Sequence, residues 1–345
     1  MLEAPDLAPE RITAVLRQYG LAVASLTRLS LGLDTAAWTY RAITETGGQY
    51  FLKLRRDGVI PTALSVPRTL ADQGAMHVVA PLRTKTGQLW AALDPLTVTV
   101  YPFVDATAGM AHGMQRHWLA FGAALREVHD AQLPADLART VPRERFSLAF
   151  LFRRLRQTPW ANVVAALEAL AAAPNAESSA LRELAAWWQA QRLLVFGLAE
   201  RFSALGDQLR RTSPALVLCH ADIHPNNLLI DRDDRLWMVD WDEVLFAPKE
   251  CDLMMGIGGL GDYPAGPGEA ARFLAGYGHG EVDPVALAFY RHARALGDIG
   301  ANVEQILRPE ADEATRIDVL RRLRLLFAPG YIVSLAQQSV SHPRG

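Results

Sequence analysis

The chain has 345 residues, of which 50% are hydrophobic and 21% are charged, a composition typical of packed globular proteins and unlike that of disordered or fibrous ones. Its 35 Lys and Arg residues nearly balance its 37 Asp and Glu residues, and the formal net charge is −2. No strong positive field is therefore available to attract nucleic acid or anionic lipid, and we expect neither as a partner. At roughly 150 residues per domain, this length predicts two lobes.

The two cysteines, Cys219 and Cys251, have no CxxC spacing, which excludes a disulfide framework and a structural zinc site. Residues 1–6 carry two acids and lack the basic and apolar regions of a secretory signal. The longest segment without a charged residue, 325–343, is interrupted by Pro329 and by polar residues and is too short to span a bilayer. These features predict a cytoplasmic protein, whereas the oligomeric state is left open.

The first part of the chain has the pattern of a small lobe built on an antiparallel sheet. Helical periodicity ends at a glycine, and β-branched and aromatic segments then alternate with turn-forming residues. The expected elements are, in order, a helix over 10–19, strands over 36–43 and 49–54 that form a hairpin, a helix over 62–72, and strands over 88–93 and 96–103.

Beyond Phe103 the strand signals nearly vanish and long Ala- and Leu-rich helical segments begin, first over 117–130 and then over 146–211. A strand-rich island over 216–239 interrupts them. We therefore predict an N-terminal nucleotide-binding lobe over 1–104 and a helical C-terminal lobe over 105–345, the latter with the catalytic loop and the acceptor site. The fold class is α+β.

The strand-rich island contains a polar loop, HADIHPNN over 220–227, that matches H-x-D-x-x-x-x-N, the spacing of the catalytic loop of kinases. Phosphoryl transfer needs a carboxylate that accepts the proton of the attacking hydroxyl, which predicts Asp222 as the general base. It also needs Mg²⁺ ligands, and the amide oxygen of Asn227 supplies one without adding negative charge near the phosphates. Asp240, at the end of the next strand, is the second predicted metal ligand.

Lys53 lies on the strand over 49–54, where the kinase mechanism places a cation for the α- and β-phosphates of ATP, although solvated strand lysines are common. In the turn over 29–36, backbone N–H groups together with Asp34 and Thr35 are candidates for phosphate contacts. This turn is not a G-x-G-x-x-G loop, and an ordinary hairpin loop explains it equally well. His220 and His224 flank Asp222 and are expected to orient the catalytic loop rather than to bind metal.

Segments 218–230 and 239–242 resemble the aminoglycoside phosphotransferase family of small-molecule kinases. Segments 65–74, 79–81 and 240–254 further resemble the spectinomycin phosphotransferase branch of that family. The resemblance covers both lobes and implies a bilobal protein-kinase-like fold that uses ATP and Mg²⁺.

The same resemblance implies that ATP is bound near Tyr101, Phe103 and Asp105, and that Asp252 has a structural role. One departure from the pattern concerns Lys53. Kinase-like enzymes usually pair this lysine with a Glu on the following helix, yet residues 61–74 contain no Glu. Either Asp57 or Asp72 replaces it, or the lysine is held differently.

Carboxylates that follow the metal-binding segment would complement a cationic acceptor such as an aminocyclitol. Asp242 and Glu243 are the candidates for acceptor contacts, while Asp262, Asp298 and Glu304 are better explained as solvated charges.

Together these features predict an O-phosphotransferase that transfers the γ-phosphate of ATP to a hydroxyl of an aminoglycoside or aminocyclitol antibiotic such as spectinomycin. A metabolic kinase for choline, homoserine or a sugar would need the same catalytic set, because the chemistry leaves the acceptor pocket unconstrained. A nonenzymatic nucleotide-binding module is favoured only by the missing helix Glu. A protein kinase is disfavoured because the eleven residues between Asp240 and Asp252 leave no room for a long activation loop.

Overall fold

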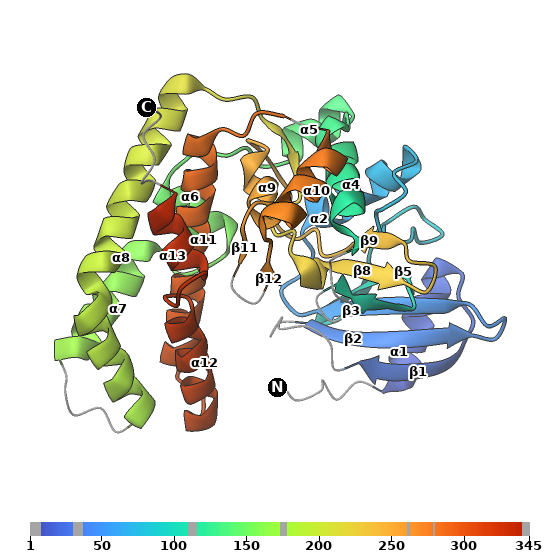
Figure 1. Cartoon of the computed structure of the whole chain (residues 1–345). Helices are drawn as coiled ribbons and strands as arrows, with labels where there is room; N and C mark the ends of the chain where they lie inside the picture. Colours follow the sequence, from blue (N-terminus) through green and yellow to red (C-terminus); the bar gives the residue numbers. More distant parts are fainter. Residues whose placement is uncertain are drawn as a thin grey trace. The chain divides into compact units, whose positions relative to one another are not determined.

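A computed structural model describes residues 8–29, 37–109, 116–172, 178–260, 263–278 and 280–339 (Figure 1). Its contacts divide the chain into two compact units. The first comprises 1–117, 130–142 and 222–244, and the second comprises 118–129, 143–221 and 245–345. The loop and strands over 222–244 thus pack with the N-terminal sheet, whereas the functional division predicted at residue 104 stays a prediction.

The predicted α+β class is confirmed: the N-terminal part is an antiparallel sheet and the C-terminal part is mostly helical. The sheet of the first unit has the strand order β1-β2-β3-β5-β4, with every neighbouring pair antiparallel. Its elements are α1 (Pro9–Leu16) with the 3-10 turn η1 (Arg17–Tyr19), β1 (Val23–Leu29), β2 (Ala37–Thr44), β3 (Gln49–Arg55), α2 (Pro61–Asp72), β4 (Ala91–Leu93) and β5 (Leu96–Pro102).

The predicted hairpin is confirmed as β2 and β3, with Ile43 paired to Gln49 at its closed end. Side chains alternate between the two faces of β3. Leu52 and Leu54 are fully buried in the apolar core beneath the sheet. Lys53 and Arg55 therefore project from the opposite face, two residues apart and side by side.

A second, three-stranded sheet of the first unit has the order β6-β8-β9 and is followed along the chain by the segment around Asp240. The strand β6 was not predicted, because its three residues, Ala-Thr-Ala, carry almost no strand pattern. It pairs with β8 through Thr107 and Ile230. The remaining elements of this unit are β6 (Ala106–Ala108), α5 (Ala135–Thr140), the 3-10 turn η3 (Pro225–Asn227), β8 (Leu228–Asp231) and β9 (Leu236–Met238).

The second unit is built around two long helices, α8 and α11, whose apolar faces share one large core. Within the residues described, no helix is both long and apolar enough to cross a membrane. Its elements are α4 (Trp118–Asp130), α6 (Leu148–Arg154), α7 (Trp160–Ala172), α8 (Ser179–Thr212), β7 (Val217–Cys219), β10 (Leu245–Ala247), α9 (Glu250–Gly256), β11 (Gly259–Leu260), β12 (Tyr263–Pro264), α10 (Pro267–Tyr277), α11 (Pro284–Leu307), α12 (Glu313–Leu325) and α13 (Ile332–Gln338).

The helices α4 and α10 touch backbone to backbone through two glycines. A Cβ atom on Gly122 would lie 2.0 Å from the carbonyl oxygen of Phe273, and one on Gly276 would lie 1.9 Å from that of Leu119. These distances leave no room for a methyl group. The close approach also brings His129 of α4 within hydrogen-bond distance of Tyr277 of α10, at 2.7 Å.

We expect Gly276→Ala to lower the free energy of unfolding by about 1–3 kcal/mol, since the added methyl group forces the two helices apart. Gly197→Ala is the matched control, because Gly197 is an exposed helical glycine whose Cβ would meet nothing within 4 Å. The control should stabilise the protein by about 0.5–1 kcal/mol through helix propensity. Urea denaturation followed by circular dichroism checks both, and equal effects of the two substitutions would contradict the packing argument.

Candidate active site

Lys53 on β3 forms two ion pairs within the first unit. Its Nζ lies 3.2 Å from Oδ1 of Asp240 and 3.2 Å from Oδ2 of Asp242. The Lys53 side chain is 16% exposed, which weakens solvent screening of these pairs compared with pairs on an open surface. The predicted phosphate-binding lysine and one predicted metal ligand are thus direct neighbours.

The predicted catalytic loop is organised by hydrogen bonds around Asp222. Nδ2 of Asn227 donates to the backbone oxygen of Asp222 at 2.9 Å. The backbone N–H of Asn226 donates to Nδ1 of His224 at 3.2 Å, which leaves Nε2 as the protonated nitrogen of a neutral ring. That Nε2 lies 3.7 Å from Oδ2 of Asp222. His224 therefore faces the predicted base, as expected for a residue that orients the loop.

Asp240 has a left-handed backbone conformation, with φ of 63°. This conformation is uncommon for residues other than glycine, although Asp tolerates it better than most, and it is concentrated at functional sites. Just before it, the N–H of Val239 donates to the backbone oxygen of Asn227 at 3.0 Å. That bond joins the segments that carry the two predicted metal ligands.

The side chains at this site fit Mg²⁺, which prefers carboxylate and amide oxygens. Asp240 supplies a carboxylate whose side chain is 47% exposed. Because Nδ2 of Asn227 is used in the bond to Asp222, the amide oxygen Oδ1 is the remaining polar atom of that side chain. Asn227 and Asp240 are therefore the residues that would hold the ion.

Arg55 is a part of the site that was not predicted, and its partner Asp242 was predicted only as a contact for the acceptor. Nη1 of Arg55 donates to Oδ2 of Asp242 at 2.5 Å, the same oxygen that lies next to Lys53. Burial alone would raise the pKa of Asp242, but the charges and hydrogen bonds of Lys53 and Arg55 outweigh it and lower that pKa below its usual value. The spacing of two between Lys53 and Arg55 on one strand was the available signal.

The predicted nucleotide contacts lie on β5, the strand that pairs with β3, and in the segment that follows β5. Tyr101 is opposite Phe51 in the sheet, and burial, together with the charges of Asp242 and Asp240, raises the pKa of its phenol. The guanidinium of Arg41 stacks over the ring of Phe103, 4.6 Å from its centroid. Asp105 is ion-paired to Arg232.

The remaining predicted contacts are placed only in part. Asp34 and Thr35 lie outside the described residues, as does Asp262. Glu243 is half-buried next to Asp242. In the second unit, Asp298 pairs with Arg294 one helical turn away, at 3.0 Å. Another acid of α11, Glu304, accepts the backbone N–H of Thr158 at 3.1 Å. These two partners favour structural roles for both acids.

In the second unit, Asp252 anchors the beginning of the catalytic loop. Its two oxygens accept the backbone N–H groups of His220 at 2.8 Å and Ala221 at 2.7 Å. His129 lies 3.2 Å from the same carboxylate, and Cys219 is buried beside it. Burial raises the pKa of the Cys219 thiol, which opposes the thiolate that a metal would need, so hydrogen bonding explains this cluster better than a metal site.

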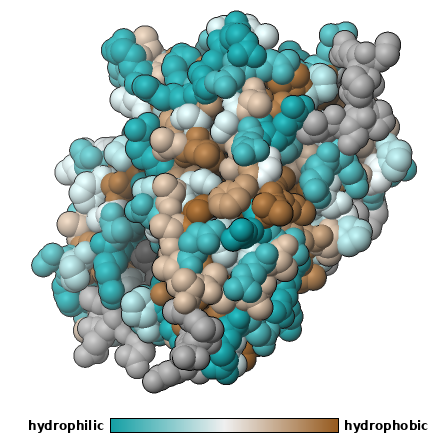
Figure 2. Space-filling view, turned by 90° about the vertical axis from the view of Figure 1, so that its left-hand side faces the viewer, coloured by the Kyte–Doolittle hydropathy of each residue, from teal (hydrophilic) through white to brown (hydrophobic). Residues whose placement is uncertain are grey.

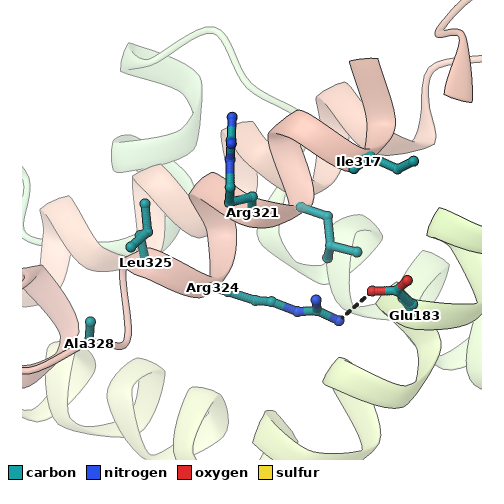
Figure 3. A pocket seen from close by; sticks show the side chains of 7 residues that line it. Glu183, Ile317, Arg321, Arg324, Leu325 and Ala328 are labelled. Carbon is teal, nitrogen blue, oxygen red and sulfur yellow. Dashed lines mark hydrogen bonds and ion pairs between the residues drawn. The ribbon is translucent and has the colours of Figure 1, made fainter. Parts of the chain in front are cut away.

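A surface pocket of about 390 Å³ lies between α8 and α12 in the second unit (Figure 3). Nη2 of Arg324 contacts Oε2 of Glu183 across it at 2.8 Å. None of the predicted site residues lines this pocket. Figure 2 shows the molecule from the side on which α7 and α8 lie in Figure 1, with hydrophobic residues gathered among hydrophilic ones.

Within the first unit, Lys53 on β3 pairs with Asp240 after β9, and Asn227 donates a hydrogen bond to Asp222 in the part of the predicted catalytic loop that belongs to this unit. The chain belongs to the phosphotransferase enzyme family (APH), whose model matches residues 25–290.

The chain is also similar to individual phosphotransferases. It matches a crystal structure of spectinomycin phosphotransferase, APH(9)-Ia, in complex with ADP and spectinomycin, with 26% identity and a TM-score of 0.85 over 97% of this chain and 99% of that one. It is 33% identical over 116 residues to an aminoglycoside 3'-phosphotransferase of Streptomyces ribosidificus, and 36% identical over 104 residues to one of Streptomyces fradiae. Those segments span 41% and 39% of the two relatives and 32% and 27% of this chain. The sequence-based resemblance is confirmed.

We expect Asp252→Asn to lower the free energy of unfolding by about 3 kcal/mol, because an amide presents N–H groups where two backbone N–H groups need acceptors. The exposed pair of Asp207 and Arg210 provides the control, since Asp207→Asn should cost less than about 1 kcal/mol. Urea denaturation measures both. If the two losses were equal, Asp252 would have no anchoring role.

Proposed function

We propose that the protein is an ATP- and Mg²⁺-dependent O-phosphotransferase that transfers the γ-phosphate to a hydroxyl of an aminocyclitol antibiotic such as spectinomycin. The observation that carries this proposal is the clustering of Lys53, Asp240 and Asp242 in a chain whose family and fold are those of phosphotransferases. The antibiotic as acceptor is supported by the near full-length similarity to a protein crystallised with ADP and spectinomycin.

Each residue has a distinct part in this proposal. Asp222 accepts the proton of the attacking hydroxyl and orients its oxygen. Lys53 offsets negative charge on the phosphates, and Asn227 and Asp240 would hold Mg²⁺. The bound ion would supply electrostatic stabilisation of the charge that develops on the transferred phosphoryl group. His224, whose Nε2 lies 3.7 Å from Oδ2 of Asp222, helps to keep that carboxylate oriented.

The acceptor is tested by measuring ADP release by the purified protein with Mg²⁺-ATP, using spectinomycin, other aminoglycosides, choline, homoserine and simple sugars. Mass spectrometry then checks each product for one added phosphate. Phosphorylation of spectinomycin or a related aminocyclitol supports the proposal. Turnover of only choline, homoserine or a sugar would retain the kinase chemistry and replace the acceptor.

The role of Asp222 gives a separate prediction. Asp222→Ala should reduce kcat by about 10²–10⁴-fold, the range attributed to general base catalysis, while leaving the dissociation constant for ATP nearly unchanged. Asp233→Ala is the matched control, because Asp233 is an exposed acid in the turn between β8 and β9. Steady-state kinetics and isothermal titration calorimetry separate the two effects, and unchanged turnover in Asp222→Ala would remove Asp222 from the mechanism.

A further inference from the structure

Asp57 and Asp72, the two predicted substitutes for the absent helix Glu, are paired with arginines. Asp57 accepts two hydrogen bonds from Arg55, at 3.0 and 2.9 Å. Asp72 lies 2.6 Å from Arg68 and 2.8 Å from Arg83. The ion pairs of Lys53 run instead to Asp240 and Asp242, which follow β9. Two carboxylates of the proposed metal-binding segment thus hold the lysine, while Asp72, the acid of α2, pairs with arginines.

Asp240 and Asp242 are not equivalent as partners of Lys53. Asp240 is a proposed metal ligand, and a carboxylate that coordinates Mg²⁺ attracts a neighbouring ammonium less strongly. Asp242 is then the partner that keeps Lys53 in place. Its Oδ2 is shared between Lys53 and Arg55, and the guanidinium of Arg55 is fixed from its other edge by the two-pronged contact with Asp57.

This arrangement favours a defined position for Asp242. The donors of a guanidinium lie in one rigid plane. Because Asp57 holds one edge of the Arg55 guanidinium, the donors on its other side point toward Asp242 in a fixed direction. The Arg55 side chain is 12% exposed, and little water competes for its bonds. Without Arg55, Asp242 would lose this donor, and Asp240 and Asp242 would place two negative charges beside Lys53 without the second cation that offsets them, where the proposed polyanionic phosphate chain has to bind.

We propose that Asp242 and Arg55 together replace the helix glutamate: Arg55 is a positioning residue that fixes Asp242, and Asp242 fixes Lys53 for binding the nucleotide phosphates. This inference rests on the proposed phosphotransferase function and deepens it, since it assigns Asp242 to the nucleotide end of the site rather than to the acceptor.

The test compares Arg55→Gln, Arg55→Lys and Asp242→Asn with the unaltered protein. We expect Arg55→Gln and Asp242→Asn each to raise the dissociation constant for Mg²⁺-ADP about tenfold, measured by isothermal titration calorimetry. The KM for ATP should rise with it, while the KM for the acceptor stays unchanged. Arg55→Lys should bind Mg²⁺-ADP more tightly than Arg55→Gln but less tightly than the unaltered protein. Lysine keeps the positive charge of arginine but lacks its planar set of donors.

Arg83→Gln is the matched control, since Arg83 forms an ion pair with Asp72 in the same unit and should leave Mg²⁺-ADP binding unaltered. A lower melting temperature without a change in nucleotide affinity would make Arg55 merely structural and overturn the inference. So would a raised acceptor KM in Asp242→Asn with normal Mg²⁺-ADP binding, because it would place Asp242 at the acceptor.

The binding measurement needs no acceptor, which separates this inference from the proposed function. If no alcohol is phosphorylated but Arg55→Gln still weakens Mg²⁺-ADP binding, the positioning role stands and the phosphotransferase proposal fails. If Arg55→Gln does not fold, Asp242→Glu against Asp242→Asn provides the same comparison. The inference is supported if Asp242→Glu keeps its affinity for Mg²⁺-ADP and Asp242→Asn loses it. Equal affinities in the two variants contradict the inference.

Discussion

Lys53, the proposed phosphate-binding cation, forms ion pairs with two carboxylates of the segment that follows β9. The ion pairs from Lys53 to Asp240 and Asp242 connect the five-stranded sheet with the residues that follow the three-stranded sheet. The rest of the proposed site depends on this connection. It sets the position of Asp240, and the hydrogen bond between Val239 and Asn227 extends that order to the catalytic loop.

Much of the fold could be predicted because local pattern and global structure agree. The hairpin of β2 and β3, the helix α2 and the long helices of the second unit follow from periodicity and turn residues. The strand β6 could not be predicted, since Ala-Thr-Ala gains its strand conformation from pairing with β8. The contact between α4 and α10 depends on Gly122 and Gly276, which sequence alone marks only as weak helix formers.

For the site, the H-x-D-x-x-x-x-N spacing indicated Asp222 and Asn227 because a single loop has to present both groups. The partner of Lys53 was harder to infer. A helix Glu is recognisable from its distance along the chain, whereas Asp242 lies almost two hundred residues beyond Lys53, and its pairing exists only in three dimensions. Arg55 was not predicted for a related reason. The role of a second cation on a strand can be inferred only when the carboxylate that pairs with it is known, and here that carboxylate is Asp242.

The strands β7 and β10 pair antiparallel, with Cys219 opposite Leu245, so the chain enters and leaves residues 222–244 at neighbouring points of one short ribbon. Pairing of β7 with β10 closes residues 222–244 into a loop, and the entropic cost of closing a loop depends only weakly on its length. Insertions in the exposed turn over 232–235 should therefore be tolerated, whereas a single residue added next to β7 or β10 would shift the position of every group that residues 222–244 carry.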